Sequence, residues 1–195
     1  MCGRYYIAID EKELRDICDA VKREQEEEPE QMEIKFNGEV FPTDIVPVWT
    51  RLGYKAMKWG FSGFDSRPVI NARSETARTK PMFRESMQLR RCLVPASGYY
   101  EWKREGSSKI KHRIYIPGQP MFFAGCYRRE TNSQMDSFVI LTRVAAGSIE
   151  HIHDRMPVII PKSRAGEWLR DNPDMMGAAH TLDDYLRFTS ISLRG

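Results

Sequence analysis

Apolar residues recur with helical spacing near the start of the chain. Four of them fall on one face of a helix: Leu14, Ile17, Cys18 and Val21. This pattern predicts a helix over about residues 11–23. Asp10 and Glu13 have the spacing of a capping box at its start. The acidic segment 24–30 that follows contains Pro29 and is expected to form a solvated loop.

Short apolar runs broken by proline and glycine predict strands through the middle of the chain. The predicted strands cover residues 54–61, 92–95, 99–102, 113–116, 121–127, 138–142 and 158–160. Residues 41–49 are too rich in proline for a central strand and are expected to form an extended segment on the core. Pro81 is expected to start a short helix that turns Phe83 and Met87 inward. A late helix around Trp168 is expected to be capped by Ser163.

Helices at both ends and strands between them predict an α+β fold. We expect a largely antiparallel sheet that curls or closes into a barrel, with peripheral helices. The length of 195 residues and the apolar fraction of 41% predict one domain over residues 1–195.

The cysteines, and the absence of a membrane-spanning or secretory segment, indicate the cellular compartment of the protein. No apolar run is long enough to span a bilayer, and no secretory pattern is present at the start. The four cysteines have no zinc-like spacing: Cys2, Cys18, Cys92 and Cys126. Thiols of this kind predict a reducing, cytoplasmic location. We expect no cofactor and no bound metal.

Charge is nearly balanced in total but unevenly distributed. The chain has 30 basic and 27 acidic residues, a net charge of +3. Basic residues concentrate in segments 84–104 and 109–113. Such patches suit a polyanion such as nucleic acid, although a solvated face would have the same composition.

Cys2 offers the most specific chemistry. If Met1 is removed, Cys2 carries a thiol and a free α-amine on adjacent carbons. A 1,2-aminothiol condenses with an aldehyde, first to an imine and then to a five-membered thiazolidine. The ordinary pKa of an α-amine is about 7.7–8.0 and that of a thiol about 8.5, so both keep a reactive fraction near neutral pH. The alternative is a small apolar residue near a chain end.

Glu101 and His153 are candidates for proton transfer. Glu101 lies among aromatic residues, and partial burial there would raise its pKa. The alternative is a strand residue that points to water. His151 and His153 are two residues apart, but no third ligand supports a metal site. We therefore expect His153 to act as an acid or electrostatic partner, or to be fixed in a loop by Asp154.

A guanidinium, an amide and a carboxylate lie close together in segment 71–75. Arg73 is suited to grip a phosphate, while Asn71 is suited to orient a nucleophile. The alternative is a helix-start network with Ser74 as cap and Arg73 paired with Glu75. Arg4 is expected to hold a phosphate beside Cys2 and to lower the pKa of its thiol.

Several segments together resemble the SRAP family, the SOS response-associated peptidases or abasic-site processing proteins. The similar segments, in the family's order, are residues 1–4 (MCGR), 71–75 (NARSE), 91–102 (RCLVPASGYYEW) and 152–157 (IHDRMP), with a looser match over 42–48. The segment after Trp59 departs from the family pattern, because it is shorter and lacks a second tryptophan. Phe64 is a candidate substitute for it.

The resemblance implies the SRAP fold and recognition of abasic sites in single-stranded DNA. It implies a thiazolidine cross-link to sugar C1′, removal of Met1 by the protein itself and a strand-cleaving lyase activity. The implied roles are Cys2 as nucleophile, Glu101 as proton shuttle, His153 acting on the sugar oxygen, Asn71 positioning Cys2, and Arg4, Arg73, Pro42, Trp59 and Arg155 in contact with DNA. We expect a monomer without membrane contact that associates with the nucleoid when bound to DNA.

Two other functions fit the same residues. A cysteine peptidase acting on polypeptides could use Cys2, Glu101 and His153, although a terminal amine adds nothing to proteolysis. A non-covalent binder of single-stranded DNA would use the basic and aromatic residues alone.

Overall fold

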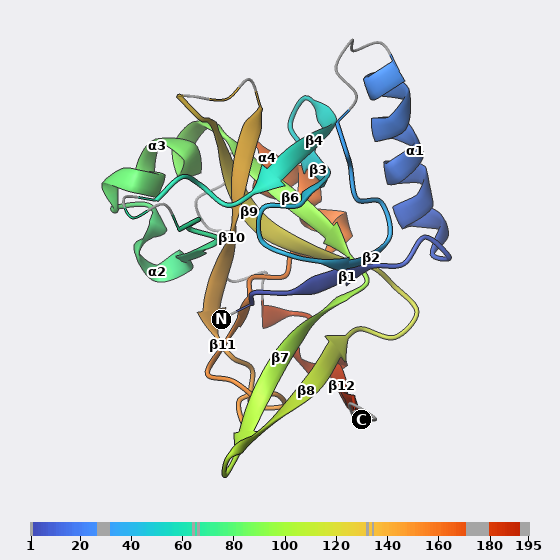
Figure 1. The fold of residues 1–195 in the computed structure, drawn as a ribbon, viewed down its shortest axis with the longest axis vertical. Helices are drawn as coiled ribbons and strands as arrows, with labels where there is room; N and C mark the ends of the chain where they lie inside the picture. The colour runs from blue at the N-terminus through green and yellow to red at the C-terminus, as the bar shows by residue number, and fades with distance from the viewer. Residues whose placement is uncertain are drawn as a thin grey trace.

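A computed structural model describes residues 2–26, 32–63, 65, 67–131, 133, 135–170 and 180–191 (Figure 1). The elements in chain order are β1 (Tyr5–Ile7), α1 (Lys12–Glu26), β2 (Gly38–Val40), β3 (Ile45–Thr50), β4 (Gly53–Trp59), β5 (Asn71–Arg73), α2 (Ser74–Ala77), α3 (Pro81–Leu89), β6 (Arg91–Ala96), β7 (Gly98–Glu105), β8 (Ser108–Tyr115), β9 (Met121–Arg129), β10 (Asp136–Val144), β11 (Arg155–Pro157), the 3-10 helix η1 (Lys162–Arg164), α4 (Ala165–Leu169), the 3-10 helix η3 (Asp183–Tyr185) and β12 (Arg187–Ile191).

Five strands close into a barrel in the order β10-β4-β3-β6-β9, because β10 pairs with both β4 and β9. The short strands β5 and β11 also pair with β10. A second sheet has the order β12-β8-β7-β1-β2 and is antiparallel throughout. Among the described strand pairs, only the pairings of β10 with β4 and with β5 are parallel. The predicted α+β class and the largely antiparallel, barrel-like sheet are confirmed.

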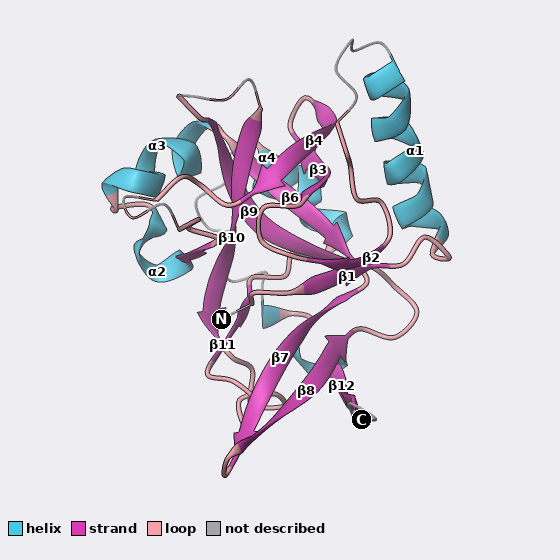
Figure 2. Cartoon of the chain, in the orientation of Figure 1, coloured by secondary structure: helices cyan, strands magenta, loops and turns pink. Residues whose placement is uncertain are grey.

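Helices surround the barrel, as Figure 2 shows. The first predicted helix is confirmed as α1, and its four apolar positions are all buried. α1 covers β3 and β4, while α2 and α3 lie on the other side of the barrel against β10 and β9 (Figure 1). Pro81 starts α3 with Phe83 and Met87 buried, as predicted. The predicted acidic loop lies largely outside the described residues. No described helix is long and apolar enough to cross a membrane.

Three local predictions are wrong. Residues 45–50 form the central strand β3 despite Pro47. On one edge β3 pairs with β4 along its whole length, but on the other edge β6 pairs only with Trp49 and Thr50. At Pro47 this second edge has no partner in β6, so the missing N–H of proline costs no hydrogen bond to that strand. The strand predicted over 158–160 is a single bridge from Ile159 to Phe123. Ser163 lies inside η1 and caps nothing.

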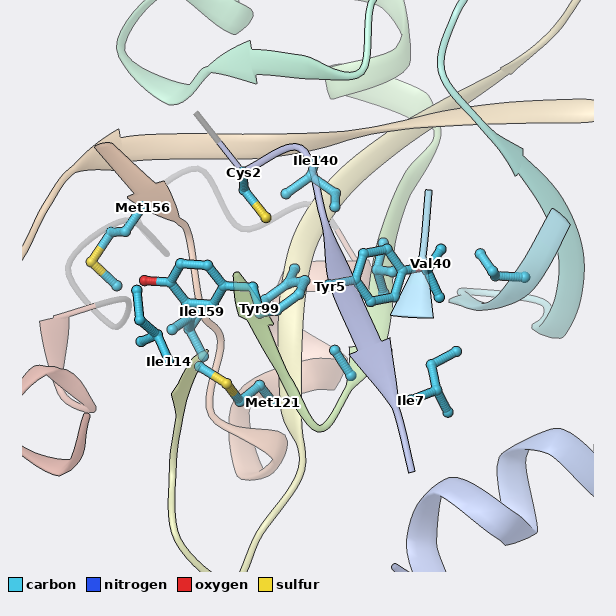
Figure 3. Close-up of a cluster of buried hydrophobic side chains, with 14 of the residues drawn as sticks. Cys2, Tyr5, Ile7, Val40, Tyr99, Ile114, Met121, Ile140, Met156 and Ile159 are labelled. Carbon is cyan, nitrogen blue, oxygen red and sulfur yellow. The ribbon is translucent and has the colours of Figure 1, made fainter. Parts of the chain in front are cut away.

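Two apolar clusters stabilise this arrangement. One joins the barrel to the second sheet and contains Tyr5, Trp59 and Tyr99, with Cys2 at its margin (Figure 3). The other lies between the barrel and the helices and contains Ile17 and Trp168. The fold thereby fixes the first residues of the chain against the beginning of β7.

Candidate functional site

Strand pairing brings the four predicted catalytic residues together from distant parts of the sequence. Cys2 lies a few residues before β1, which pairs with β7, the strand that carries Glu101. Asn71 starts β5, and His153 lies just before β11. Both of these strands pair with β10, in adjacent register positions. The start of β5 thereby contacts Cys2, and His153 faces Glu101 of β7.

Cys2 is enclosed and positioned by Asn71. The residue is 0% exposed, and the Asn71 side chain donates a hydrogen bond from Nδ2 to the Cys2 carbonyl oxygen at 2.8 Å. Oδ1 of Asn71 is buried and has no hydrogen-bond partner within the described part of the chain. The Asn71 side chain thus holds Cys2 through its nitrogen. Its oxygen, Oδ1, remains available to accept a hydrogen bond from a ligand.

The Cys2 thiol is held in its neutral form. Burial raises its pKa well above the ordinary value, and the negative charge of Glu101 raises it further. Arg4 does not give the lowered thiol pKa that was predicted, because its backbone contact lowers the pKa but burial outweighs that effect. The Arg4 guanidinium instead binds Glu39, with 2.8 Å from Nη1 to Oε1.

Glu101 points into the protein. The strand alternation of β7 turns Tyr99 and Glu101 inward and leaves Tyr100 and Trp102 partly exposed. Glu101 is 4% exposed, which excludes the alternative of a solvent-facing carboxylate. Burial raises its pKa to about 7. Near neutral pH the group therefore exists in both protonation states, as a proton shuttle requires.

His153 faces the same carboxyl group. Its Nε2 lies 3.9 Å from Oε2 of Glu101. Its Nδ1 accepts the backbone N–H of Arg155 at 3.0 Å, and burial lowers its pKa. Asp154 Oδ1 also lies 2.8 Å from Nδ1, but this carboxylate is 86% exposed and a backbone N–H can only donate. We therefore assign a neutral imidazole with the proton on Nε2, directed at Glu101.

The two histidines face different neighbours. His151 packs against Phe188, with the ring centroids 5.0 Å apart. It lies in a turn with His153 rather than on a strand where both would share a face. No cluster of potential metal ligands occurs among the residues that the structure describes.

Two hollows are lined by three of the four residues. A pocket of about 280 Å³ is lined by Glu101, Trp102, Arg104, Lys109 and His153. A groove of about 950 Å³ includes Asn71 and has a basic rim. Its cationic residues are Arg73, Lys80 and Arg128. Both hollows carry basic residues, which suits the approach of a polyanion.

The predicted phosphate-gripping arginines differ in their availability. Arg73 is exposed and has no ion pair within the described residues. Glu75 does not pair with it, but with Arg155, whose Nη1 and Nη2 lie 2.6 and 2.8 Å from the two carboxylate oxygens. Arg155 also donates to the Thr142 carbonyl at 2.7 Å. The alternative network of Arg73 with Glu75 is therefore wrong, and Arg73 remains open to a phosphate.

The remaining residues predicted to contact DNA also differ in their exposure. Trp59 is 0% exposed and donates from Nε1 to the Ile70 carbonyl at 3.0 Å, so its side chain cannot contact DNA and that prediction is wrong. Pro42 is half-buried and precedes Thr43, which has a φ of 77°. A positive φ at a β-branched residue is strained and is typical of functional sites. Phe64 lies outside the described residues.

Sequence reasoning missed Phe41 and Lys111. Phe41 is 41% exposed, and the Arg4 guanidinium lies 3.9 Å from its ring centroid. Lys111 binds the same Glu39 oxygen as Arg4, at 2.8 Å. Both residues lie far from Arg4 in sequence, and the pairing of β1 with β2 and β7, and of β7 with β8, brings them together.

Comparison with known proteins confirms the family resemblance. The model of the SOS response associated peptidase (SRAP) family matches residues 1–192, so the chain belongs to this family. The abasic site processing protein YedK of Escherichia coli is 39% identical over 117 residues, 57% of this chain and 53% of YedK. The abasic site processing protein YoaM of Bacillus subtilis is 35% identical over 151 residues, 73% of this chain and 58% of YoaM.

The chain matches only somewhat more than half the length of these curated relatives. A crystal structure of a protein from Bacteroides thetaiotaomicron has a TM-score of 0.80 and 22% identity, over 98% of this chain and 93% of that chain. At this identity the likeness shows a shared fold.

Proposed function

We propose that this chain captures abasic sites in single-stranded DNA covalently, through Cys2 after removal of Met1. The observation that carries the proposal is the enclosure of Cys2 beside Asn71, Glu101 and His153, with basic hollows around them. The names of the curated relatives refer to abasic-site processing and support the same substrate. An abasic sugar opens to an aldehyde, which is the partner of a terminal aminothiol.

The raised thiol pKa favours attack by the amine first. A buried thiol that stays protonated is a poor nucleophile. The amine nitrogen bonds to C1′ of the aldehyde and gives a carbinolamine, which loses water to form an imine. The sulfur then bonds to C1′ while the thiol proton passes to nitrogen. Aldehyde and aminothiol together become thiazolidine and one water.

Glu101 and His153 supply the proton transfers. The protonated Glu101 donates to the departing hydroxyl of the carbinolamine, and the ionised form accepts a proton when the thiol closes the ring. The Nε2–H of His153 interacts with the sugar oxygen that is released when the ring opens. Asn71 holds the Cys2 carbonyl and so fixes the direction of the amine.

Removal of Met1 and strand cleavage belong to the same proposal. The same carboxyl group and histidine would assist hydrolysis of the first peptide bond. Cleavage would proceed from the imine, by loss of the 3′ phosphate through elimination, in competition with ring closure. The proposal also includes a monomeric protein that acts in the cytoplasm, on the DNA of the nucleoid.

The test combines mass spectrometry with denaturing gels. Mature protein is incubated with an oligonucleotide that contains one abasic site. We expect loss of Met1 and an adduct mass equal to protein plus DNA minus one water. Cys2→Ala should abolish the durable adduct while leaving non-covalent binding largely intact.

A matched control separates the aminothiol from the thiol alone. Inserting one alanine between Met1 and Cys2 keeps the sulfur but moves the terminal amine away from it. We expect this variant to form no thiazolidine. A normal yield of durable adduct in either variant would refute the proposal.

The same experiment addresses the alternatives. A peptidase acting on polypeptides needs a readily formed thiolate, which the raised pKa of Cys2 opposes. A non-covalent binder would hold intact and abasic strands alike and leave no species on the denaturing gel.

A further inference from the structure

The outer face of the second sheet carries alternating aromatic rings and cations. Strand alternation directs Tyr6 of β1, and Tyr100 and Trp102 of β7, to this face, and Arg4 just before β1 joins them. The Arg4 guanidinium lies 3.9 Å from the ring centroid of Phe41 and 5.4 Å from that of Trp102. The series thus begins beside the start of the chain.

The series continues across β7 and β8. Lys111 Nζ lies 3.9 Å from the centroid of Tyr100 and 5.6 Å from that of Trp102. The guanidinium of Arg113 lies 4.9 Å from the ring of Tyr6 and 4.7 Å from that of Tyr115. We call these residues the outer-face tract: Arg4, Tyr6, Phe41, Tyr100, Trp102, Lys111, Arg113 and Tyr115.

The charge on this face is mainly positive. The strand register adds Arg104 and Lys109, which are paired across β7 and β8 and exposed, to the cations of the tract. Among the described residues at these outward positions of β1, β2, β7, β8 and β12, Glu39 is the only carboxylate. It is already held by Arg4 and Lys111. A surface of this composition is complementary to a polyanion.

The tract is continuous with the candidate active site. Trp102 lines the pocket that also contains Glu101 and His153. Figure 1 shows the β7–β8 hairpin extending from the barrel, away from the helices. A strand that enters the pocket can therefore continue along the hairpin.

We propose that the outer-face tract binds the single-stranded DNA that flanks the captured site, by stacking unpaired bases on Trp102 and Tyr100 and holding a phosphate with the exposed Arg113. This inference rests on the proposed function and extends it to a second binding surface. Side chains two positions apart on a strand are about 6.6 Å apart, and aromatic rings and arginine planes at that spacing accept successive splayed bases. Paired bases in a duplex do not present their faces in this way.

The test compares binding to short and long oligonucleotides. The probe is a single strand with one tetrahydrofuran, an abasic analogue without an aldehyde, flanked on each side by two or by ten thymidines. The test variants are Arg113→Gln and Tyr100→Leu. The matched control is Lys58→Gln, an exposed cation on β4 in the barrel.

We expect losses only for the long strand. Arg113→Gln should weaken its binding several-fold and lower the slope of log affinity against log salt by about 0.7, the value for one phosphate contact on a single strand. Tyr100→Leu should weaken it about fivefold or more, as expected for one lost stacking interaction. Lys58→Gln should change neither, and a blunt duplex of the long sequence should bind alike in all variants.

Two results would overturn the proposal that the outer-face tract binds DNA. One is an equal loss for short and long strands in Arg113→Gln, and the other is a loss in Lys58→Gln that matches it. The thermal melting temperature of each variant checks that it is folded. If Tyr100→Leu proves unstable, the test rests on Arg113→Gln. Adduct formation by the unaltered protein with a short reactive strand is measured in parallel. If no adduct forms, the proposed function fails; if it forms without any length dependence, only the tract fails.

Discussion

The raised pKa of Glu101 links the chemistry of the site to the stability of the fold. The perturbation is Glu101→Gln, which keeps the size and polarity of the side chain and removes its charge. In the unfolded chain the carboxyl group titrates near its ordinary pKa of 4.5, whereas burial raises the pKa to about 7 in the folded protein. Folded and unfolded states therefore bind different numbers of protons between these two values.

The magnitude follows from the two pKa values. Each pKa unit corresponds to about 1.4 kcal/mol, so ionising Glu101 in the folded state costs about 3 kcal/mol. Because the folded pKa is the higher one, the favourable contribution is complete below pH 4.5. It decreases as pH rises from about 4.5 to about 7 and is absent above that. At 4% exposure, little solvent screening reduces this effect.

The assay is urea unfolding at half-unit steps from pH 4.5 to pH 8.5 at constant ionic strength. We expect the free energy of unfolding of the unaltered protein to fall relative to that of Glu101→Gln by about 3 kcal/mol across this window. Other titrating groups contribute equally to both proteins and cancel. The variant should thus be relatively more stable above pH 7, while its adduct formation slows about 100-fold or more.

A control with the opposite sign makes the reasoning falsifiable. The bond from Arg155 lowers the pKa of Glu75, so Glu75 stabilises the fold above its unfolded pKa and loses that contribution as pH falls. Because this loss falls below pH 4.5, the curves for this control are extended to lower pH, where Glu75→Gln should shift the difference curve in the other direction. Parallel curves for Glu101→Gln and the unaltered protein would show that Glu101 titrates normally, and its role as a shuttle would be withdrawn.

Three further substitutions test individual contacts. Asn71→Ala removes the 2.8 Å bond to the Cys2 carbonyl, and we expect adduct formation to slow about tenfold with little change in DNA binding, measured by gel-based kinetics. Trp168→Phe leaves the Cys92 carbonyl without its 2.8 Å partner and should cost about 1–3 kcal/mol in urea unfolding. Gly98→Ala would bring Cβ within 2.5 Å of a backbone carbonyl oxygen on β8, so thermal melting should report a loss of about 2 kcal/mol; an unchanged melting temperature would contradict the close packing of β7.

Local patterns in the sequence were sufficient for the elements that local interactions determine. The apolar spacing of α1 and the proline at the start of α3 both act within a few residues. The central position of β3 was missed because its tolerance of Pro47 depends on how far β6 extends along it. That register is set by contacts between segments more than 40 residues apart, which no local pattern encodes.

The site shows the same division. The pairing of β1 and β7 decides which face Glu101 takes, a question that alternation alone left open. The binding of Arg4 to Glu39 depends on β1 pairing with β2, so its effect on Cys2 was misjudged from sequence proximity. Trp59 was assigned to DNA by its motif, yet the barrel encloses it completely.

Burial of Cys2 and Glu101 determines the sequence of steps in the proposed reaction. The low-polarity enclosure that keeps the Cys2 thiol protonated also keeps Glu101 partly protonated near neutral pH. An acid is therefore present when the carbinolamine must lose water, and the thiol delivers its own proton when the ring closes. A thiolate formed early would attack the aldehyde without the nitrogen and give a hemithioacetal, which reverses readily. Enclosure of the sulfur thus favours the nitrogen-first route, and a basic form of Glu101 above pH 7 assists closure to the durable ring.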